Sequence, residues 1–325
     1  MSRVTRTAVV GVGRLGGEHA RILSLLPGSR LVGVHDRRPS RAEAVAERVG
    51  QGTRAFRRLD PLLDEVDAVV VAVPTRSHHE VGRAVLEAGC HLLVEKPLAP
   101  SMEEARGLAA AAESRDLRLC VGRVERFNPA VRGGRSYVGG PRFVIAERLS
   151  PFRRRGTDVG VVLDLMIHDL DLVLSMAGAP VRETDAVGVS VLTDSVDLAN
   201  ARLEFEDGAV AQVTASRVSA TSARRLRVFQ ESGHLNLDLA SGEGEFLHRS
   251  APGLPVGADS GIGDVAERET IDDDGREPLR LEVEGFLQRV RGDGGEAVTG
   301  REALPALELA LRITREIEES SHVPA

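Results

Sequence analysis

The stretch Thr7-Ala8-Val9-Val10-Gly11-Val12-Gly13-Arg14-Leu15-Gly16 joins a short apolar run to three glycines spaced as GxGxxG. Helix-forming residues follow from Glu18 to Leu23, so the pattern predicts a strand, a tight turn and a helix. A second apolar run, Arg30 to His35, leads to an acidic residue, Asp36. A dinucleotide-binding fingerprint requires a glycine turn between a strand and a helix, and an acidic side chain at the end of the next strand. Both are present here.

Each residue of this turn has a predicted role in binding a cofactor. Gly11 permits the tight turn, Gly13 lets the backbone approach a pyrophosphate, and Gly16 lets helix and strand pack closely. The helix N-terminus, at Arg14 and Leu15, then holds the phosphates.

Asp36 predicts the type of dinucleotide. Its carboxylate would accept hydrogen bonds from the adenosine ribose hydroxyls and repel a 2′-phosphate, which favours NAD. Arg37 and Arg38 follow directly, and an arginine here can pair with that phosphate. NADP therefore stays possible.

The chain from 5 to 126 alternates strand-like and helix-like segments. Capping-box patterns (Ser40 with Glu43, and Ser101 with Glu104) predict helices over 41–48 and from 101 to 112. A fully apolar run is typical of a parallel strand that is covered on both faces. The predicted strands include 7–10, 30–35, 68–73, 92–94 and 117–121. We expect a Rossmann domain over residues 1–123, with a doubly wound parallel sheet of six strands.

After about residue 125 the pattern changes to short alternating segments. Strands are predicted over 187–191, 199–205, 209–214 and 235–239, and Glu206-Asp207-Gly208 predicts a hairpin turn. These features indicate an open, mainly antiparallel sheet in an α+β domain over 124–325. Residues 250–278 are rich in Gly and Asp and predict a loop. Helices over 281–290 and 302–319 end the chain and could pack back on the first domain.

Composition excludes several classes of protein. The 325 residues include 42 basic and 49 acidic side chains, a net charge of −7. This balance argues against nucleic acid as the main partner. Two cysteines, Cys90 and Cys120, cannot build a disulfide framework or a thiolate zinc site, and we expect no metal. The sequence contains no apolar run of transmembrane length and no signal-peptide pattern near Met1, so we expect a cytoplasmic protein.

Lys96 is the only lysine, because 41 of the 42 basic residues are arginine. A biased nucleotide composition would replace lysine by arginine wherever only a surface charge is needed. It would spare a lysine whose chemistry arginine cannot supply, namely an ammonium that can lose its proton. Lys96 follows the predicted strand 92–94, and ligands bind at the carboxyl ends of strands in such sheets. We therefore interpret Lys96 as a catalytic candidate rather than a solvated surface lysine.

Asp164 and His168 form a second candidate pair. On a helix they are four residues apart and share one face, where a carboxylate would orient an imidazole for general-base work. Alone, this spacing is more typical of an ordinary pair on a helix surface. A Tyr-x-x-x-Lys mechanism is excluded, because the only tyrosine, Tyr137, has no lysine four residues later.

Four motifs, in this order along the chain, resemble the Gfo/Idh/MocA oxidoreductase family. They are Gly11 to Gly16, Val73-Pro74-Thr75, Glu95-Lys96-Pro97 and Asp164 to His168. The resemblance implies a nicotinamide-dependent enzyme that oxidises a sugar or polyol hydroxyl to a ketone, and a second domain that often forms homo-oligomer contacts (a dimer or tetramer). It further implies that Pro74, Thr75 and Glu95 contact the cofactor, and that Lys96, Asp164 and His168 surround the substrate.

Further segments resemble the subgroup that oxidises C3 of UDP-N-acetylglucosamine to a 3-keto sugar, which a transaminase then uses for the 3-amino sugar of lipid A. These segments are 124–129, 148–152 and 158–169, and they imply substrate contacts by Arg126, Asn128, Arg148 and Arg155. Arg123 and Arg153-Arg154-Arg155 depart from the subgroup pattern; the three arginines fit a solvated loop as well as a diphosphate clamp.

Two alternatives stay open from sequence. The first is an NADPH-dependent reductase of a nucleotide-linked keto-sugar. The second is a non-catalytic nucleotide or sugar sensor of the same fold. The sequence also leaves open whether Lys96 or His168 is the formal base.

Overall fold

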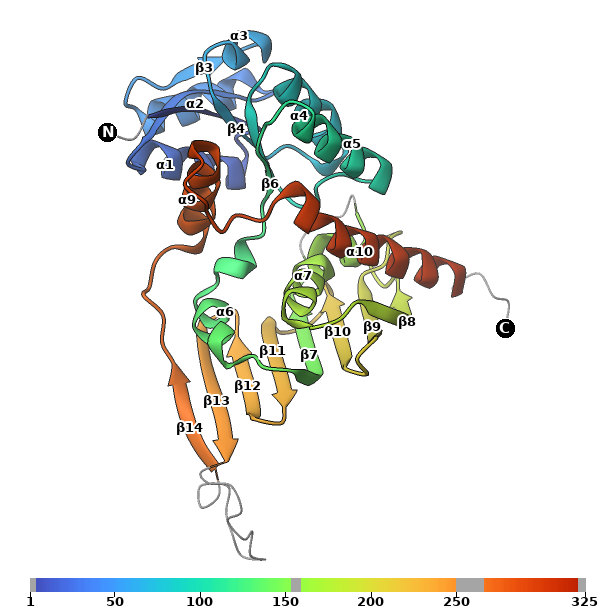
Figure 1. Cartoon of the computed structure of the whole chain (residues 1–325). Helices are drawn as coiled ribbons and strands as arrows, with labels where there is room; N and C mark the ends of the chain where they lie inside the picture. The colour runs from blue at the N-terminus through green and yellow to red at the C-terminus, as the bar shows by residue number, and fades with distance from the viewer. Residues whose placement is uncertain (1–3, 153–158, 250–265, 321–325) are drawn as a thin grey trace, which may run out of the picture. The chain divides into compact units, whose positions relative to one another are not determined.

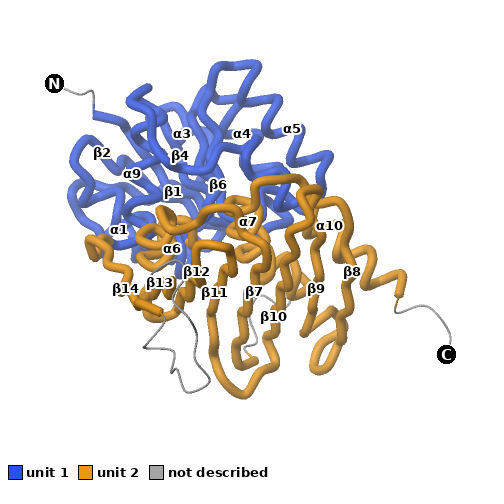
Figure 2. The backbone as a smooth tube through the Cα atoms, turned by 60° about the horizontal axis from the view of Figure 1, so that its bottom comes forward, with its two compact units in different colours: residues 1–124, 277–307 blue, residues 125–276, 308–325 orange. Residues whose placement is uncertain are grey.

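The computed structural model describes residues 4–152, 159–249 and 266–320. The chain divides into two compact units, shown in Figure 2. Unit 1 contains residues 1–124 and 277–307, and unit 2 contains residues 125–276 and 308–325. A segment close to the C-terminus therefore belongs to the same unit as the N-terminal glycine turn.

Unit 1 is built on a parallel sheet of six strands in the order β3-β2-β1-β4-β5-β6 (Figure 1). The strands are β1 (Thr5–Val10), β2 (Ser29–His35), β3 (Arg54–Phe56), β4 (Ala68–Val71), β5 (His91–Val94) and β6 (Leu119–Val121). The predicted doubly wound sheet is confirmed. Strand β3 was not located from sequence, since its three residues form no apolar run.

Helices connect these strands. They are α1 (Arg14–Leu25), α2 (Pro39–Val49), α3 (Asp60–Leu63), the short 3₁₀ helix η1 (Thr75–Ser77), α4 (His78–Glu87), α5 (Met102–Glu113) and, from the later segment, α9 (Pro278–Arg291). The expected cap of α5 is confirmed, because the Ser101 side chain accepts from the backbone N–H of Glu104. The expected cap of α2 is wrong: the helix begins one residue before Ser40, with proline in its first turn.

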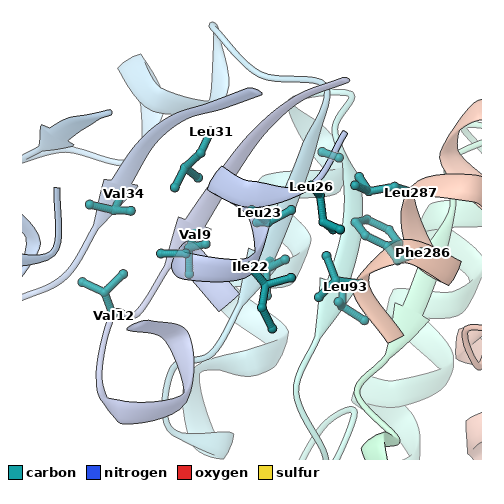
Figure 3. Close-up of a cluster of buried hydrophobic side chains, with 14 of the residues drawn as sticks. Val9, Val12, Ile22, Leu23, Leu26, Leu31, Val34, Leu93, Phe286 and Leu287 are labelled. Atoms are coloured by element: carbon teal, nitrogen blue, oxygen red, sulfur yellow. The ribbon is translucent and has the colours of Figure 1, made fainter. Parts of the chain in front are cut away.

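The core of unit 1 joins α1 to α9 beside the sheet. Figure 3 shows Ile22 and Leu23 of α1, and Leu26 directly after this helix, close to Phe286 and Leu287 of α9. All five side chains are at most 4% exposed. Burial of this apolar surface holds α9 in unit 1 despite its distance along the chain.

Unit 2 contains an eight-stranded sheet in the order β14-β13-β12-β11-β7-β10-β9-β8. The strands are β7 (Pro141–Leu149), β8 (Val181–Val189), β9 (Leu198–Phe205), β10 (Val210–Ser216), β11 (Ala223–Gln230), β12 (Gly233–Asp238), β13 (Glu243–Arg249) and β14 (Ala266–Ile271). Only β7 and β10 pair in parallel. The expected open, mainly antiparallel sheet is therefore confirmed.

Four of these strands were missed in the sequence. Strand β11 contains three arginines, and charge hid its alternation of buried and exposed side chains. Strand β14 lies within the predicted loop 250–278, and four of its six residues are exposed. An exposed edge strand carries no apolar signal.

The helices of unit 2 are short. They are η2 (Val124–Phe127), which begins at the unit boundary, α6 (Pro129–Gly134), η3 (Arg135–Tyr137), the π-helix η4 (Val162–Met166) and α7 (Ile167–Met176). Helix α10 (Gly300–Ser320) begins in unit 1 and ends in unit 2. Within the described parts of the chain, no helix has the length and apolar character to cross a membrane.

A buried charge pair organises one end of the unit 2 sheet. Asp197, which is fully buried, accepts backbone N–H groups from Val191, Leu192 and Thr193 at 2.6–2.9 Å and the Arg217 guanidinium at 2.8 Å. Burial opposes the charge, but these hydrogen bonds outweigh it and hold the Asp197 pKa well below its usual range. Arg217 also donates to the carbonyl of Val159 at 2.8 Å, close to the start of the π-helix.

The variant Asp197→Asn should destabilise unit 2 by about 3–5 kcal/mol, since it removes the buried carboxylate that pairs with Arg217 and accepts three backbone N–H groups. We expect this loss in urea unfolding at neutral pH. Because the folded pKa of Asp197 is depressed, its contribution exists above the unfolded-state value of about 3.9 and is lost as pH falls. The matched control is Asp194→Asn, an exposed carboxylate in the same loop; equal stability of the two variants would contradict this account.

Candidate active site

Five of the ten residues predicted to bind the cofactor line one cavity of unit 1, and the other five (Arg14, Leu15, Gly16, Thr75 and Glu95) are not among its lining residues. The cavity has a volume of about 860 Å³, and Gly11, Gly13, Asp36, Arg37 and Pro74 all line it. It lies at the carboxyl ends of β1, β2 and β4. From β1 the next strands along the chain, β2 and β3, are added on one side, whereas β4, β5 and β6 are added on the other side. Ligands bind at this switch point, between β1 and β4, in doubly wound folds.

The three glycines of the motif differ in what surrounds them. Gly11 has a φ of +84°, which only glycine adopts readily. A Cβ at Gly16 would lie 1.9 Å from the carbonyl oxygen of Gly11, so α1 can pack this closely only with glycine at position 16. A Cβ at Gly13 would meet no atom within 4 Å. Space above Gly13 is what a bound pyrophosphate would need.

The start of α1 suits an anion. Gly13 is its N-cap residue, and Arg14 and Leu15 open the helix with exposed side chains. Its free backbone N–H groups and positive dipole end favour phosphate. The residues present therefore fit a dinucleotide.

Asp36 links the two turns that line the cavity. Its Oδ2 accepts the Val12 N–H at 3.0 Å, and its Oδ1 accepts the Arg38 N–H at 2.9 Å. Arg41 lies in the first turn of α2, and its Nη1 is 3.4 Å from the Asp36 Oδ2. Arg38 and Arg41 line the cavity with Arg37. Sequence reasoning missed Arg41, although its position on the first turn of α2 was the available signal.

Thr75 and His78 belong to the segment that follows β4. Thr75 begins η1. His78 is buried, and its ring nitrogens lie 2.7 Å from the Pro97 carbonyl and 2.9 Å from the Val73 carbonyl. Burial lowers the His78 pKa against the pull of these carbonyls. His78 thus connects the cavity wall at Val73 to Pro97, which follows Lys96, and this is a packing role.

Glu95 and Lys96 follow β5 directly, and the Lys96–Pro97 peptide bond is cis. The Glu95 carboxylate accepts a hydrogen bond from His19 of α1 at 2.7 Å. Lys96 is half-buried. The predicted roles of Glu95 toward the cofactor and of Lys96 toward the substrate stay predictions.

Asp164 and His168 lie in unit 2, in consecutive helical segments rather than in one α-helix. Asp164 is in the π-helix η4, and His168 is in the first turn of α7. Both are half-buried, whereas their neighbours Met166, Ile167 and Asp169 are buried. The shared face expected from their spacing stays a prediction. A π-helical turn was not anticipated, and such turns are frequent at functional sites.

Three residues that the resemblance assigns to the substrate have partners inside unit 2. Arg148 is 4% exposed and donates to Asp169 and Glu125 at 2.7–2.8 Å. These charges raise its pKa even though burial opposes them.

Arg126 makes a two-pronged pair with Asp171 at 2.7 and 2.9 Å. Asn128 caps α6 and donates to the Leu239 carbonyl. Arg155 lies outside the described residues. The substrate contacts of all four residues stay predictions.

Comparison with known proteins covers both units. Residues 5–123 match the model of an oxidoreductase family with an NAD-binding Rossmann fold, and residues 121–236 match the GFO/IDH/MocA C-terminal domain. The chain is 39% identical to UDP-N-acetylglucosamine 3-dehydrogenase of Acidithiobacillus ferrooxidans over 93% of this chain and 94% of that protein.

The chain belongs to the GFO/IDH/MocA family. It is an oxidoreductase with a nicotinamide-binding Rossmann domain. A solved structure of the Acidithiobacillus enzyme aligns with a TM-score of 0.90 at 37% identity, covering 98% of this chain and 99% of that one.

Other family members are more distant. Scyllo-inositol 2-dehydrogenase (NAD(+)) of Bacillus subtilis is 31% identical over 67% of this chain and 69% of that protein. GenD2 from gentamicin A biosynthesis, solved in complex with NAD, aligns with a TM-score of 0.81 at 26% identity over 98% of this chain and 95% of that one. Homo-oligomer formation stays a prediction.

The variants Gly16→Ala and Gly13→Ala should separate folding from cofactor binding. Gly16→Ala forces α1 away from Gly11, so we expect a loss of about 1–3 kcal/mol in stability together with weaker binding of NAD. Gly13→Ala should unfold like the unchanged protein but bind NAD about tenfold or more weakly, equivalent to at least 1.4 kcal/mol. Thermal unfolding and calorimetric titration with NAD measure the two effects. Unchanged NAD affinity in Gly13→Ala would contradict the placement of the pyrophosphate.

Proposed function

We propose that this protein oxidises C3 of UDP-N-acetylglucosamine to the 3-keto sugar with NAD as the hydride acceptor. The observation that carries the proposal is the 39% identity to an enzyme of that name across nearly the full length of both chains. The inositol dehydrogenase of Bacillus matches less of the chain at lower identity. A 3-keto sugar is a substrate for transamination, so we further propose a role in supplying a 3-amino sugar, as in lipid A synthesis.

The proposed chemistry uses three side chains. When bound, the nicotinamide ring supplies the hydride acceptor. His168, oriented by Asp164, takes the proton of the C3 hydroxyl, and Lys96 hydrogen-bonds the same oxygen and stabilises its developing negative charge. We propose that substrate binding involves Arg126, Asn128, Arg148 and Arg155. Arg148 is buried against two carboxylates, so its proposed contribution is to position neighbouring groups.

Asp36 supports NAD as the cofactor, because a carboxylate at the end of β2 disfavours a 2′-phosphate. One observation favours the alternative, an NADPH-dependent reductase of a nucleotide-linked keto-sugar. Arg37, Arg38 and Arg41 line the same cavity as Asp36, and arginines pair well with phosphate.

A spectrophotometric assay separates the two functions. We expect reduced cofactor to form with NAD⁺ and UDP-N-acetylglucosamine, in the presence of a carbonyl trap that draws the reaction toward the ketone. Other UDP-sugars, myo-inositol and NADP⁺ are the comparisons. Turnover only with free polyols would reject the nucleotide-sugar substrate. A preference for NADPH and a keto-sugar would instead favour the reductase.

Substitution of Lys96 tests its role. Lys96→Met should lower turnover by roughly 10²–10⁴-fold. Lys96→Arg should fail to restore it, because a planar guanidinium does not replace the compact ammonium as a hydrogen-bond donor to the C3 oxygen. The initial rate at saturating substrate is the measurement. Arg83→Met, an exposed residue on α4, is the control for loss of one positive charge. Full activity in Lys96→Met would exclude Lys96 from the reaction.

A further inference from the structure

Unit 1 contains a cluster of three ionisable side chains buried behind the residue that precedes Lys96. His19 of α1 is fully buried, Glu282 of α9 is 1% exposed, and Glu95 after β5 is 9% exposed. One ring nitrogen of His19 and one carboxylate oxygen from each glutamate lie within 4.8 Å of one another. We call His19, Glu95 and Glu282 the buried cluster.

The hydrogen bond between His19 and Glu95 defines the state of both groups. His19 Nε2 lies 2.7 Å from Glu95 Oε1. Burial opposes the charge of Glu95, but the His19 hydrogen bond and the nearby positive groups lower the Glu95 pKa overall. An ionised carboxylate only accepts, so Nε2 carries the proton of this bond.

Glycine at position 122 helps to fix the Glu95 carboxylate. A Cβ at Gly122, just after β6, would lie 2.9 Å from Glu95 Oε2. The carboxylate is therefore held between His19 on one side and the end of β6 on the other.

Glu282 is in the opposite state. Burial and the charge of Glu95 raise its pKa well above the usual value, although the backbone N–H and charge of Arg123 act against this shift. Within the described residues, neither Glu282 carboxyl oxygen has a hydrogen bond of good geometry. Glu282 is thus neutral beside an ionised Glu95, as expected for two carboxyl groups that share one dry site.

The donor set could in principle hold a metal ion, but the charges argue against one. Glu95 is negative and Arg123 is always positive. With Glu282 neutral, the charges of Glu95 and Arg123 balance, which is the favourable state for buried charges. A divalent cation held by two ionised glutamates would still leave a net charge of +1 with the Arg123 guanidinium.

We propose that the buried cluster sets the charge of Lys96: His19 keeps Glu95 ionised and fixed, and the Glu95 anion favours the protonated form of the adjacent lysine. Glu95 and Lys96 are consecutive and interact electrostatically. Among the described residues, His78 of α4 and Glu282 of α9 also interact electrostatically with Glu95, and Arg123 after β6 interacts with Glu282. His19 and Glu95 are positioning residues, and their catalytic consequence rests on the proposed function of Lys96.

The single lysine allows a direct test on the full-length chain. Reductive methylation with ¹³C-formaldehyde labels Lys96 and the N-terminal amine, whose pKa near 8 separates the two signals. A ¹³C NMR titration then reports the midpoint of Lys96 without any substrate. Glu95→Gln should move this midpoint down by about 1 pH unit, because it removes the anion. Failure of the UDP-sugar assay would leave this result unaffected.

Three further variants identify which group acts. His19→Leu removes the hydrogen-bond donor and should shift the midpoint in the same direction, whereas His19→Gln keeps a donor and should restore it at least in part. Glu282→Gln replaces a neutral carboxyl with a neutral amide and should change little. Glu87→Gln, an exposed carboxylate on α4, is the surface control.

Two outcomes would overturn the proposal. The first is an unchanged Lys96 midpoint in Glu95→Gln or His19→Leu variants that remain folded by circular dichroism, which would leave the cluster a structural role only. The second is one equivalent of a divalent metal in the purified protein that is lost in Glu282→Gln.

Discussion

The close contact between α1 and the glycine turn is the constraint on which unit 1 depends. With no side chain at position 16, the helix packs against the carbonyl of Gly11 at a distance that no Cβ permits. This contact directs the N-terminus of α1 toward the cofactor cavity. It also places His19, nearly one helical turn later in α1, where its ring reaches the Glu95 carboxylate after β5. One packing contact therefore positions both the helix end that is predicted to bind phosphate and His19, the partner of Glu95.

Local patterns in the sequence predicted most of unit 1 because its strands are continuous apolar runs and its turns contain glycine. Strand β4 is four fully buried apolar residues, and such a run has few alternative structures. Prediction failed where charge or shortness hid the pattern, as in β3, β11 and β14. The π-helix η4 was also beyond reach, since its sequence has the composition of an ordinary helix.

In the candidate site, too, the sequence identified the residues that belong to local motifs but not the contacts between distant residues. Gly11, Gly13 and Asp36 were identified from a motif with a physical basis, and they line one cavity together with Pro74, which only the family resemblance had indicated. His19 and Glu282 could not be paired with Glu95 from sequence, because more than 180 residues separate Glu95 from Glu282 and no local pattern records a contact across that distance. Arg126 and Arg148 raise a related difficulty. The sequence does not show whether an arginine faces a ligand or a buried carboxylate, and Arg148 pairs with buried Asp169.

We propose that this family member oxidises one sugar carbon, with the hydride leaving that carbon for NAD. The most direct measurement uses UDP-N-acetylglucosamine deuterated at C3. We expect the deuterium to appear in the reduced cofactor, detected by mass spectrometry, with one deuterium per NADH formed. Unlabelled NADH would contradict oxidation at C3 even if the enzyme turned over, and NADH that does not form at all would contradict the proposed substrate.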